Sequence, residues 1–223
     1  MNKNAVVYIL RLLAERAIGA ALFFITAGGF DLRSGIFFSI YMLVAIASGI
    51  IIYCKNPETL AERGKVNTDS PKWDKILLSL FWVCAFFFVY LIAGMTFPLG
   101  MKVEFDFIAG IVIYLLSAWI TLKALLENTF LESTARIQTD RNQFVVETGP
   151  YSVVRHPTYS AVLLWCVAVR CVFPSEEVLL LALTVAVIII IRTRLEDDML
   201  RKGLAGYEEY AKKVKFRLIP YIW

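Results

Sequence analysis

The chain of 223 residues is 59% hydrophobic, with a mean hydropathy of +0.66 and a net charge of +4. Soluble domains hold about 45–50% apolar residues, so this composition excludes an ordinary soluble protein. Lys and Arg flank apolar segments and form no basic patch with interleaved aromatic residues, so we expect no nucleic-acid partner. The four cysteines fall inside apolar segments without metal-type spacing, so we expect no metal.

The apolar segments predict a polytopic helical bundle. A helix needs about 20 apolar residues to cross the hydrocarbon layer, and segments 36–54 and 76–99 meet this length almost without charge. Four further candidates are shorter or interrupted by a charge: 17–30, 107–126, 159–173 and 178–191. The first is long enough only if the helix includes 6–16, and the last is brief. The predicted fold class is all-α, with five to six membrane segments, the last two forming a helical hairpin.

The distribution of basic residues predicts the orientation. Loops rich in Lys and Arg stay in the cytoplasm, and in a six-pass arrangement all but three of the 23 basic residues fall on one side. The exceptions are Arg33, Lys102 and Arg170. We therefore expect both termini to be cytoplasmic. The outer loops are short, so any site should lie on the cytoplasmic side.

Three segments face that side. Within 55–75, Asn56-Pro57 ends a helix and residues 58–63 predict a short amphipathic turn, so we interpret this segment as a connector. The second segment, 127–157, contains a short extended run, 143–146, and then a turn.

The second segment ends at the only histidine in the chain, His156. Pro157 suits the first position of the next helix, because its missing N–H would have no partner there. A helix N-terminus favours anionic groups. His156 therefore has two interpretations, as a structural residue before proline or as part of an anion site.

The third segment begins where the last apolar run ends, with Arg192, Glu196 and Asp197. The spacing puts Arg192 and Glu196 on one helical face at the membrane boundary. This arrangement fits an ordinary interfacial ion pair, but charges that point into a membrane bundle are also candidates for function.

Together these motifs resemble a known family. Gly-Pro-Tyr-Ser-Val-Val-Arg-His-Pro-Thr-Tyr at 149–159 and Arg-Thr-Arg-Leu-Glu-Asp-Asp-Met-Leu at 192–200 resemble the bacterial branch of the isoprenylcysteine carboxyl methyltransferase family. That family is related to phospholipid methyltransferases. Shorter similar stretches extend the resemblance from about residue 56 to the last residue: 56–63, 128–130, 206–210 and 217–223. This sequence departs from other branches at Asp197 and Asp198, where those branches carry a longer run of glutamates.

The resemblance implies S-adenosyl-L-methionine as methyl donor, bound in a cytoplasm-facing pocket. It divides the chain into N-terminal transmembrane helices, 1–127, and a methyltransferase region, 128–223. Carried over by position, the cofactor-binding residues are Gln138, Gln143, Phe144, Val145, Val146, Tyr151, His156, Pro157, Tyr159 and Glu196. Arg192 matches the position that faces the methyl acceptor. The resemblance also implies the bacterial inner (plasma) membrane as the location.

Physical chemistry suggests roles for these groups. Glu196 could bind the donor's amino group, and His156 with the helix start could receive its carboxylate. Tyr151 and Phe144 offer aromatic faces to adenine or to the sulfonium. A carboxylate acceptor oriented by Arg192 needs no base, whereas an amine or thiol would use His156 or Glu196.

We expect a hydrophobic or lipid-like acceptor that enters from the bilayer, among membrane lipids. Carboxylate O-methylation is the leading reaction, with phospholipid N-methylation as an alternative. Two other hypotheses are a membrane NADPH-dependent reductase, which shares part of the Arg-His-Pro-x-Tyr motif, and a scaffold or transporter without catalysis.

Overall fold

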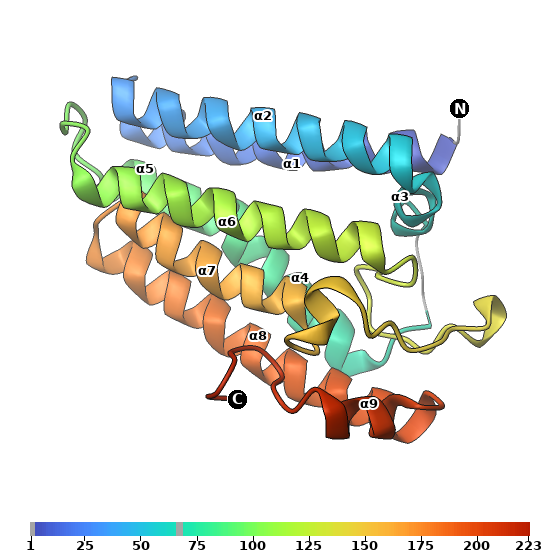
Figure 1. The fold of residues 1–223 in the computed structure, drawn as a ribbon. Helices are drawn as coiled ribbons and strands as arrows, with labels where there is room; N and C mark the ends of the chain where they lie inside the picture. Colours follow the sequence, from blue (N-terminus) through green and yellow to red (C-terminus); the bar gives the residue numbers. More distant parts are fainter. Residues whose placement is uncertain (1–2, 66–68) are drawn as a thin grey trace.

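The computed structural model describes residues 3–65 and 69–223, and these residues form helices and loops without a strand (Figure 1). The α-helices are α1 (Lys3–Ala27), α2 (Leu32–Lys55), α3 (Pro57–Arg63), α4 (Lys72–Val83), α5 (Val89–Thr96), α6 (Phe105–Glu127), α7 (Pro157–Val172), α8 (Glu176–Gly203) and α9 (Tyr207–Lys213). A π-helical turn, η1 (Cys84–Phe88), joins α4 to α5. Two 3-10 turns, η2 (Thr139–Arg141) and η3 (Gly149–Ser152), lie between α6 and α7. The predicted all-α class is confirmed.

The long helices stack in layers, as Figure 1 shows. α1 and α2 form one layer, α5 and α6 lie beneath them, and α7 and α8 follow. The most extensive packing joins α6 to α7, α1 to α5, and α1 to α3, followed by α7 to α8. The short helices α3 and α9 and the loop between α6 and α7 gather at one end of the bundle, which we call the polar end (Figure 1).

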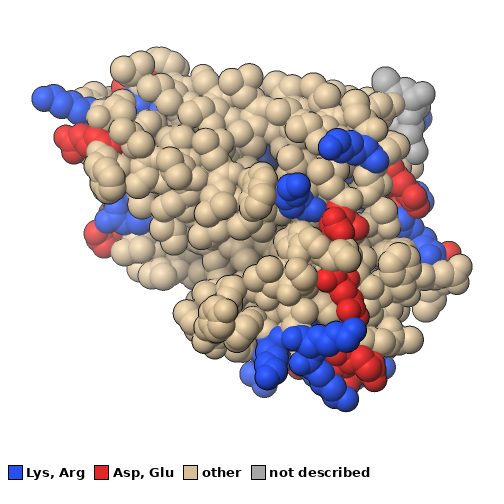
Figure 2. All heavy atoms as spheres, viewed as in Figure 1, with Lys and Arg blue, Asp and Glu red and all other residues tan. Residues whose placement is uncertain are grey.

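Among the described residues, four helices are long and apolar enough to cross a membrane: α2, the continuous stretch from α4 through η1 to α5, α6 and α8. α7 is apolar but has only 16 residues. α1 has 25 residues and is interrupted by charges, Arg16 among them. Figure 2 shows charged side chains gathered towards the two ends of the molecule, with a broad uncharged face between them. The predicted polytopic bundle is therefore confirmed.

Two predicted segments are longer than expected. α1 runs without a break through 6–16, so the first candidate is a full-length helix. The run 178–191 belongs to the longer, 28-residue α8 and lies mostly in its N-terminal half. Ser175 caps that helix by accepting a hydrogen bond from the Val178 N–H at 3.2 Å, which lets α8 begin before the apolar run starts.

Arg33 differs from the prediction in its environment. We counted it as a charge in an outer loop, but it lies inside α2 and is fully buried. Its guanidinium donates to the Val172 and Cys171 carbonyls at 3.1 Å each and to Asp106 at 3.2 Å. Those carbonyls belong to the last turn of α7, where no helical partner remains for them, so Arg33 acts as a cap supplied by another helix.

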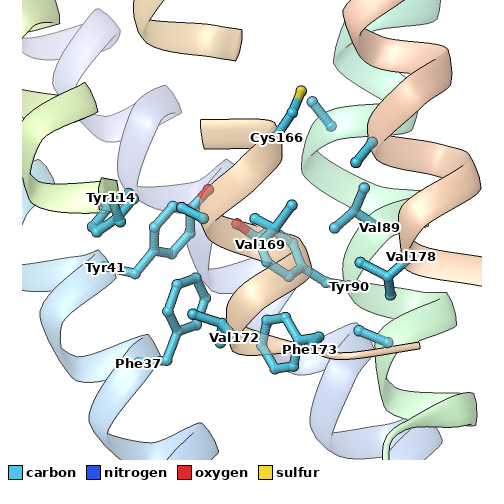
Figure 3. Packing of buried hydrophobic residues seen from close by; sticks show 14 of the residues in the cluster. Phe37, Tyr41, Val89, Tyr90, Tyr114, Cys166, Val169, Val172, Phe173 and Val178 are labelled. Carbon is cyan, nitrogen blue, oxygen red and sulfur yellow. The ribbon is translucent and has the colours of Figure 1, made fainter. Parts of the chain in front are cut away.

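The core of the bundle is aromatic (Figure 3). Phe37 and Phe173 meet edge to face with ring centroids 5.2 Å apart, and Tyr41 lies 5.5 Å from Tyr90 and 5.8 Å from Tyr114. Aromatic contacts of this kind add about 0.5–1.5 kcal/mol beyond burial. Because tyrosines belong to the cluster, hydroxyl groups lie deep within the bundle.

Candidate functional site

A cavity of about 330 Å³ extends from the polar end into the bundle. Every residue assigned to the cofactor by resemblance lines it, namely Gln138, Gln143, Phe144, Val145, Val146, Tyr151, His156, Pro157, Tyr159 and Glu196, and so does Arg192. The structure thus brings together residues separated by up to 58 positions. Their individual roles stay predictions.

His156 occupies the N-cap of α7, and Pro157 begins the helix as expected. The His156 Nε2 atom lies 3.3 Å from Asp197 Oδ1 and 3.4 Å from the Tyr207 hydroxyl. Because an ionised carboxylate only accepts, we assign the proton to Nε2, which leaves Nδ1 as an acceptor in the neutral ring. The imidazole lies parallel to the Tyr159 ring, with centroids 5.7 Å apart.

Asp197 is the centre of the network that holds this end of the site. Its fully buried carboxylate accepts from Arg155 Nε at 2.7 Å and Nη2 at 3.0 Å. Arg201 and Arg217 donate to the same group at 3.1 and 3.0 Å, and the Tyr207 hydroxyl donates at 2.9 Å. One carboxylate therefore joins α8, the start of α7 and the C-terminal tail. The three guanidinium groups outnumber the two carboxylates that pair with them, Asp197 and Glu208, so this cluster is net positive.

Tyr207 keeps its proton in this network. Burial, followed by the neighbouring Asp197 charge, raises the pKa of Tyr207 well above its usual value. The hydroxyl is therefore a donor at physiological pH, as its position beside a carboxylate requires.

Arg192 and Glu196 do not form the ion pair that their spacing suggested. Arg192 donates from Nε to Asp74 Oδ1 at 2.9 Å and from Nη2 to the Ser133 carbonyl at 2.6 Å. Its side chain is 4% exposed and its partner Asp74 is fully buried. The connector 55–75 was thus misinterpreted in part, because its last turn before the membrane supplies the partner of a predicted site residue.

Glu196 instead pairs with Tyr159, whose hydroxyl donates to Glu196 Oε2. The Arg192 guanidinium lies 5.4 Å from the centre of the same Tyr159 ring. A half-buried carboxylate and a guanidinium therefore share one tyrosine, on the wall of one cavity.

The run 143–146, predicted to be extended, forms no strand. Gln143 holds its start, because its Oε1 accepts from the Gln138 N–H at 2.7 Å. Gln138 is itself buried and donates to the Phe130 carbonyl at 2.6 Å. Within the described part of the chain, no protein acceptor takes a hydrogen bond from the N–H groups of 144–146. The run therefore lines the cavity and has backbone donors that no described acceptor occupies.

Tyr151 provides a second unmatched polar group. Its ring is buried and lines the cavity, and its hydroxyl lies near the Asn128 side chain without a well-formed hydrogen bond. Burial raises the pKa of Tyr151 above its usual value, so the hydroxyl stays a donor. Buried polar groups are rarely left without a partner, which suggests that a ligand satisfies this one.

The C-terminal tail closes the site beside α7. The backbone N–H groups of Arg155 and His156 donate to the carbonyls of Phe216 and Arg217 at 3.0 Å each. Ser160 Oγ donates to the Leu218 carbonyl at 2.6 Å. Residues 216–218 thus fix the loop that ends at His156.

Sequence reasoning missed Arg155, Asp74 and the central role of Asp197. The only signal was that these charged residues flank apolar helices, where a charge needs a partner. Within 3–65 and 69–223, no group of three His, Cys, Asp or Glu side chains could hold a metal ion.

Comparisons with known proteins concern the fold and the family. Residues 105–205 match the family described as phospholipid methyltransferase. The solved structure of the eukaryotic intramembrane Ras methyltransferase, isoprenylcysteine carboxyl methyltransferase, superposes with a TM-score of 0.57 at 18% identity, covering 93% of this chain and 74% of that one. No curated protein sequence matches the chain. The resemblance predicted from sequence is therefore confirmed, and the chain shares its fold with a polytopic membrane methyltransferase.

Proposed function

We propose that the protein is an integral membrane methyltransferase that uses S-adenosyl-L-methionine to methylate a lipid-like acceptor, with carboxylate O-methylation as the reaction. The observation that carries the proposal is that one cavity is continuous. Its polar end is lined by His156 and Glu196, and an extension of it, which we call the arm, lies between the transmembrane helices. The family match supports methyl transfer as the class of reaction.

The residues at the polar end fit the donor. Its amino group suits Glu196, the one carboxylate on that wall that is not already surrounded by guanidinium groups. Its carboxylate suits the net positive region around Arg155 and His156 at the start of α7. The unbonded N–H groups of 144–146 suit the hydrogen-bonding edge of adenine.

S-adenosyl-L-methionine supplies an electrophilic methyl group on a sulfonium. The protein's task is then to hold an acceptor atom about 3 Å from that carbon and to exclude water. Arg192 can orient an acceptor carboxylate through Nη1, because Nε and Nη2 are occupied by Asp74 and Ser133. A carboxylate is already ionised at neutral pH, so no residue needs to remove a proton.

The two substrates reach the cavity by different routes in this proposal. The charged donor comes from the cytoplasm at the polar end, and the apolar acceptor passes laterally between helices from the bilayer. The distribution of basic residues supports cytoplasmic termini, since the polar end gathers the segments that carry most of them. The bacterial inner membrane as location and the division at residues 127 and 128 remain part of the proposal.

The test is calorimetric titration of the detergent-purified protein with S-adenosylhomocysteine and, separately, with NADPH. We expect S-adenosylhomocysteine to bind and Glu196→Ala to lose at least about tenfold in affinity, because a charge-assisted hydrogen bond contributes about 1.5–3 kcal/mol. Glu177→Ala is the matched control, since Glu177 lies exposed at the opposite end of α8.

Binding of NADPH without S-adenosylhomocysteine would favour a reductase and overturn the proposal. To identify the acceptor, lipid extracts are incubated with the isotope-labelled donor, and labelled products are identified by mass spectrometry.

A further inference from the structure

The arm of the cavity that enters the bundle does not end in hydrocarbon. Its walls are apolar and aromatic, with Trp82, Phe86 and Trp165 among them, but its lining also includes Arg16 from the middle of α1. Tyr41 and Tyr114 line the same end. A guanidinium at the end of a pocket that binds a plain hydrocarbon tail is desolvated by that ligand and gains no hydrogen bond or ion pair from it.

Arg16 is poorly satisfied by the protein. Its Nη1 donates to the Leu12 carbonyl at the long distance of 3.5 Å, the Tyr114 hydroxyl is a further side-chain partner, and its buried Nε has no hydrogen-bond partner. The guanidinium lies 4.8 Å from the centre of the Tyr41 ring. Across the residues the structure describes, no acid forms an ion pair with it. The hydroxyl of nearby Tyr90 is also buried, with the Tyr41 side chain as its polar neighbour, and Figure 3 shows Tyr90 beside Tyr41.

Arg16 lies far below the polar end. On α1 it is eight residues beyond Tyr8, which also lines the cavity, and this corresponds to about 12 Å along the helix. On α6 the cavity-lining residues run from Leu125 to Tyr114, about 16 Å. Both helices therefore place the arginine end on the order of 12–16 Å from the polar end.

The position of Arg16 is fixed. One turn later on α1, Gly19 packs so tightly on η1 that a Cβ there would lie 2.8 Å from the Phe86 carbonyl. α1 cannot rotate to carry Arg16 out of the cavity without losing this contact. A charge held at this depth in a membrane protein is costly and marks a functional site by default.

We propose that the deep end of the cavity binds an oxygen acceptor, a carboxylate or carbonyl, on the far end of the methyl acceptor molecule. The acceptor is then an amphiphile with polar groups at both ends of an apolar body about 12–16 Å long, and not a chain that ends in hydrocarbon. This inference rests on the proposed function, since it takes the polar end as the place of methyl transfer. Arg16 and the tyrosine hydroxyls are the groups that would recognise the distal oxygen.

The test compares two probes of equal length, dodecanedioic acid and dodecanoic acid, titrated into the detergent-purified protein saturated with S-adenosylhomocysteine. We expect the diacid to bind about ten- to a hundredfold more tightly than the monoacid, the range that one charge-assisted hydrogen bond provides. Arg16→Met should abolish this difference and leave affinity for S-adenosylhomocysteine unchanged. Arg11→Met is the matched control, because Arg11 is exposed on the same helix and does not line the cavity.

Equal binding of the two acids by the unmodified protein, or a preference that survives Arg16→Met, overturns the inference. If S-adenosylhomocysteine itself does not bind, the proposed function fails instead, so the two failures are distinguishable. Should Arg16→Met not fold, Arg16→Lys keeps the charge but loses the fork of donors, and we expect a smaller but measurable loss of the preference for the diacid.

Discussion

Replacing Asp197 by asparagine tests whether one buried carboxylate holds the site together. Arg155 is the partner most affected, because its side chain is 2% exposed and both of its bonds to Asp197 lie in the interior. Removing one member of a buried charge pair costs about 3–5 kcal/mol, since the remaining charge stays buried without compensation. Arg201 and Arg217 are 29% and 26% exposed, so water replaces much of what they lose.

We therefore expect Asp197→Asn to lower the free energy of unfolding by about 3–5 kcal/mol, measured by SDS titration in mixed micelles. The affinity for S-adenosylhomocysteine should fall at least about tenfold at a temperature where the variant is folded, because Arg155 and His156 line the cavity and are positioned by Asp197. Asp198→Asn is the control, as it removes the same charge from the adjacent residue. Equal losses of unfolding free energy for both variants would refute this account. So would a loss below about 1 kcal/mol for Asp197→Asn, since a value that small is ordinary for surface positions.

Two further predictions concern regions away from the centre of the site. Arg33→Met should lower the free energy of unfolding by about 3 kcal/mol, because it leaves the carbonyls at the end of α7 without donors. Calorimetry should find the affinity for S-adenosylhomocysteine unchanged. A loss of affinity would mean that this cap also shapes the cavity. The Arg136 hydrogen bond lowers the pKa of the Asp140 carboxyl. The pair therefore stabilises the folded loop fully above the unfolded-state pKa, near 3.9, and this stabilisation is lost as pH falls through the lower folded-state pKa. Limited pepsin digestion should therefore find the loop of Asp140→Asn cut faster than that of the unmodified protein near pH 4, with the difference shrinking at lower pH, and an increasing difference would contradict the sign.

The sequence predicted elements well where the signal was local. Pro157 marked the first residue of α7, and Asn56-Pro57 marked the end of α2. The run 143–146 was predicted to be extended, but it forms no strand, and the N–H groups of 144–146 donate to no acceptor among the described residues. Local pattern specifies conformation more reliably than it specifies partners.

Partners that lie far apart in the sequence could not be predicted in this way. Arg192 was assigned to Glu196 because they are one turn apart, yet its partner Asp74 lies 118 residues earlier. A buried guanidinium gains more from a buried carboxylate than from one at the surface, and only the folded bundle decides which carboxylate is buried. The residues at the polar end of the cavity were found through resemblance, whereas the ion pairs that hold them, and the residues at its deep end, were not.

These ion pairs imply that the two parts of the cavity are stabilised by different kinds of interaction. The polar end is built from loops fixed by buried charges, Asp197 with Arg155 and Asp74 with Arg192, and by the tail at 216–218. The arm is built from helices that pack through aromatic contacts and close backbone approach, as at Gly19. Because different interactions stabilise the two parts, substitutions in the arm can change which acceptor is bound without disturbing the donor. Arg16 and Asp197 are the residues at which this separation can be measured, since each belongs to one part only.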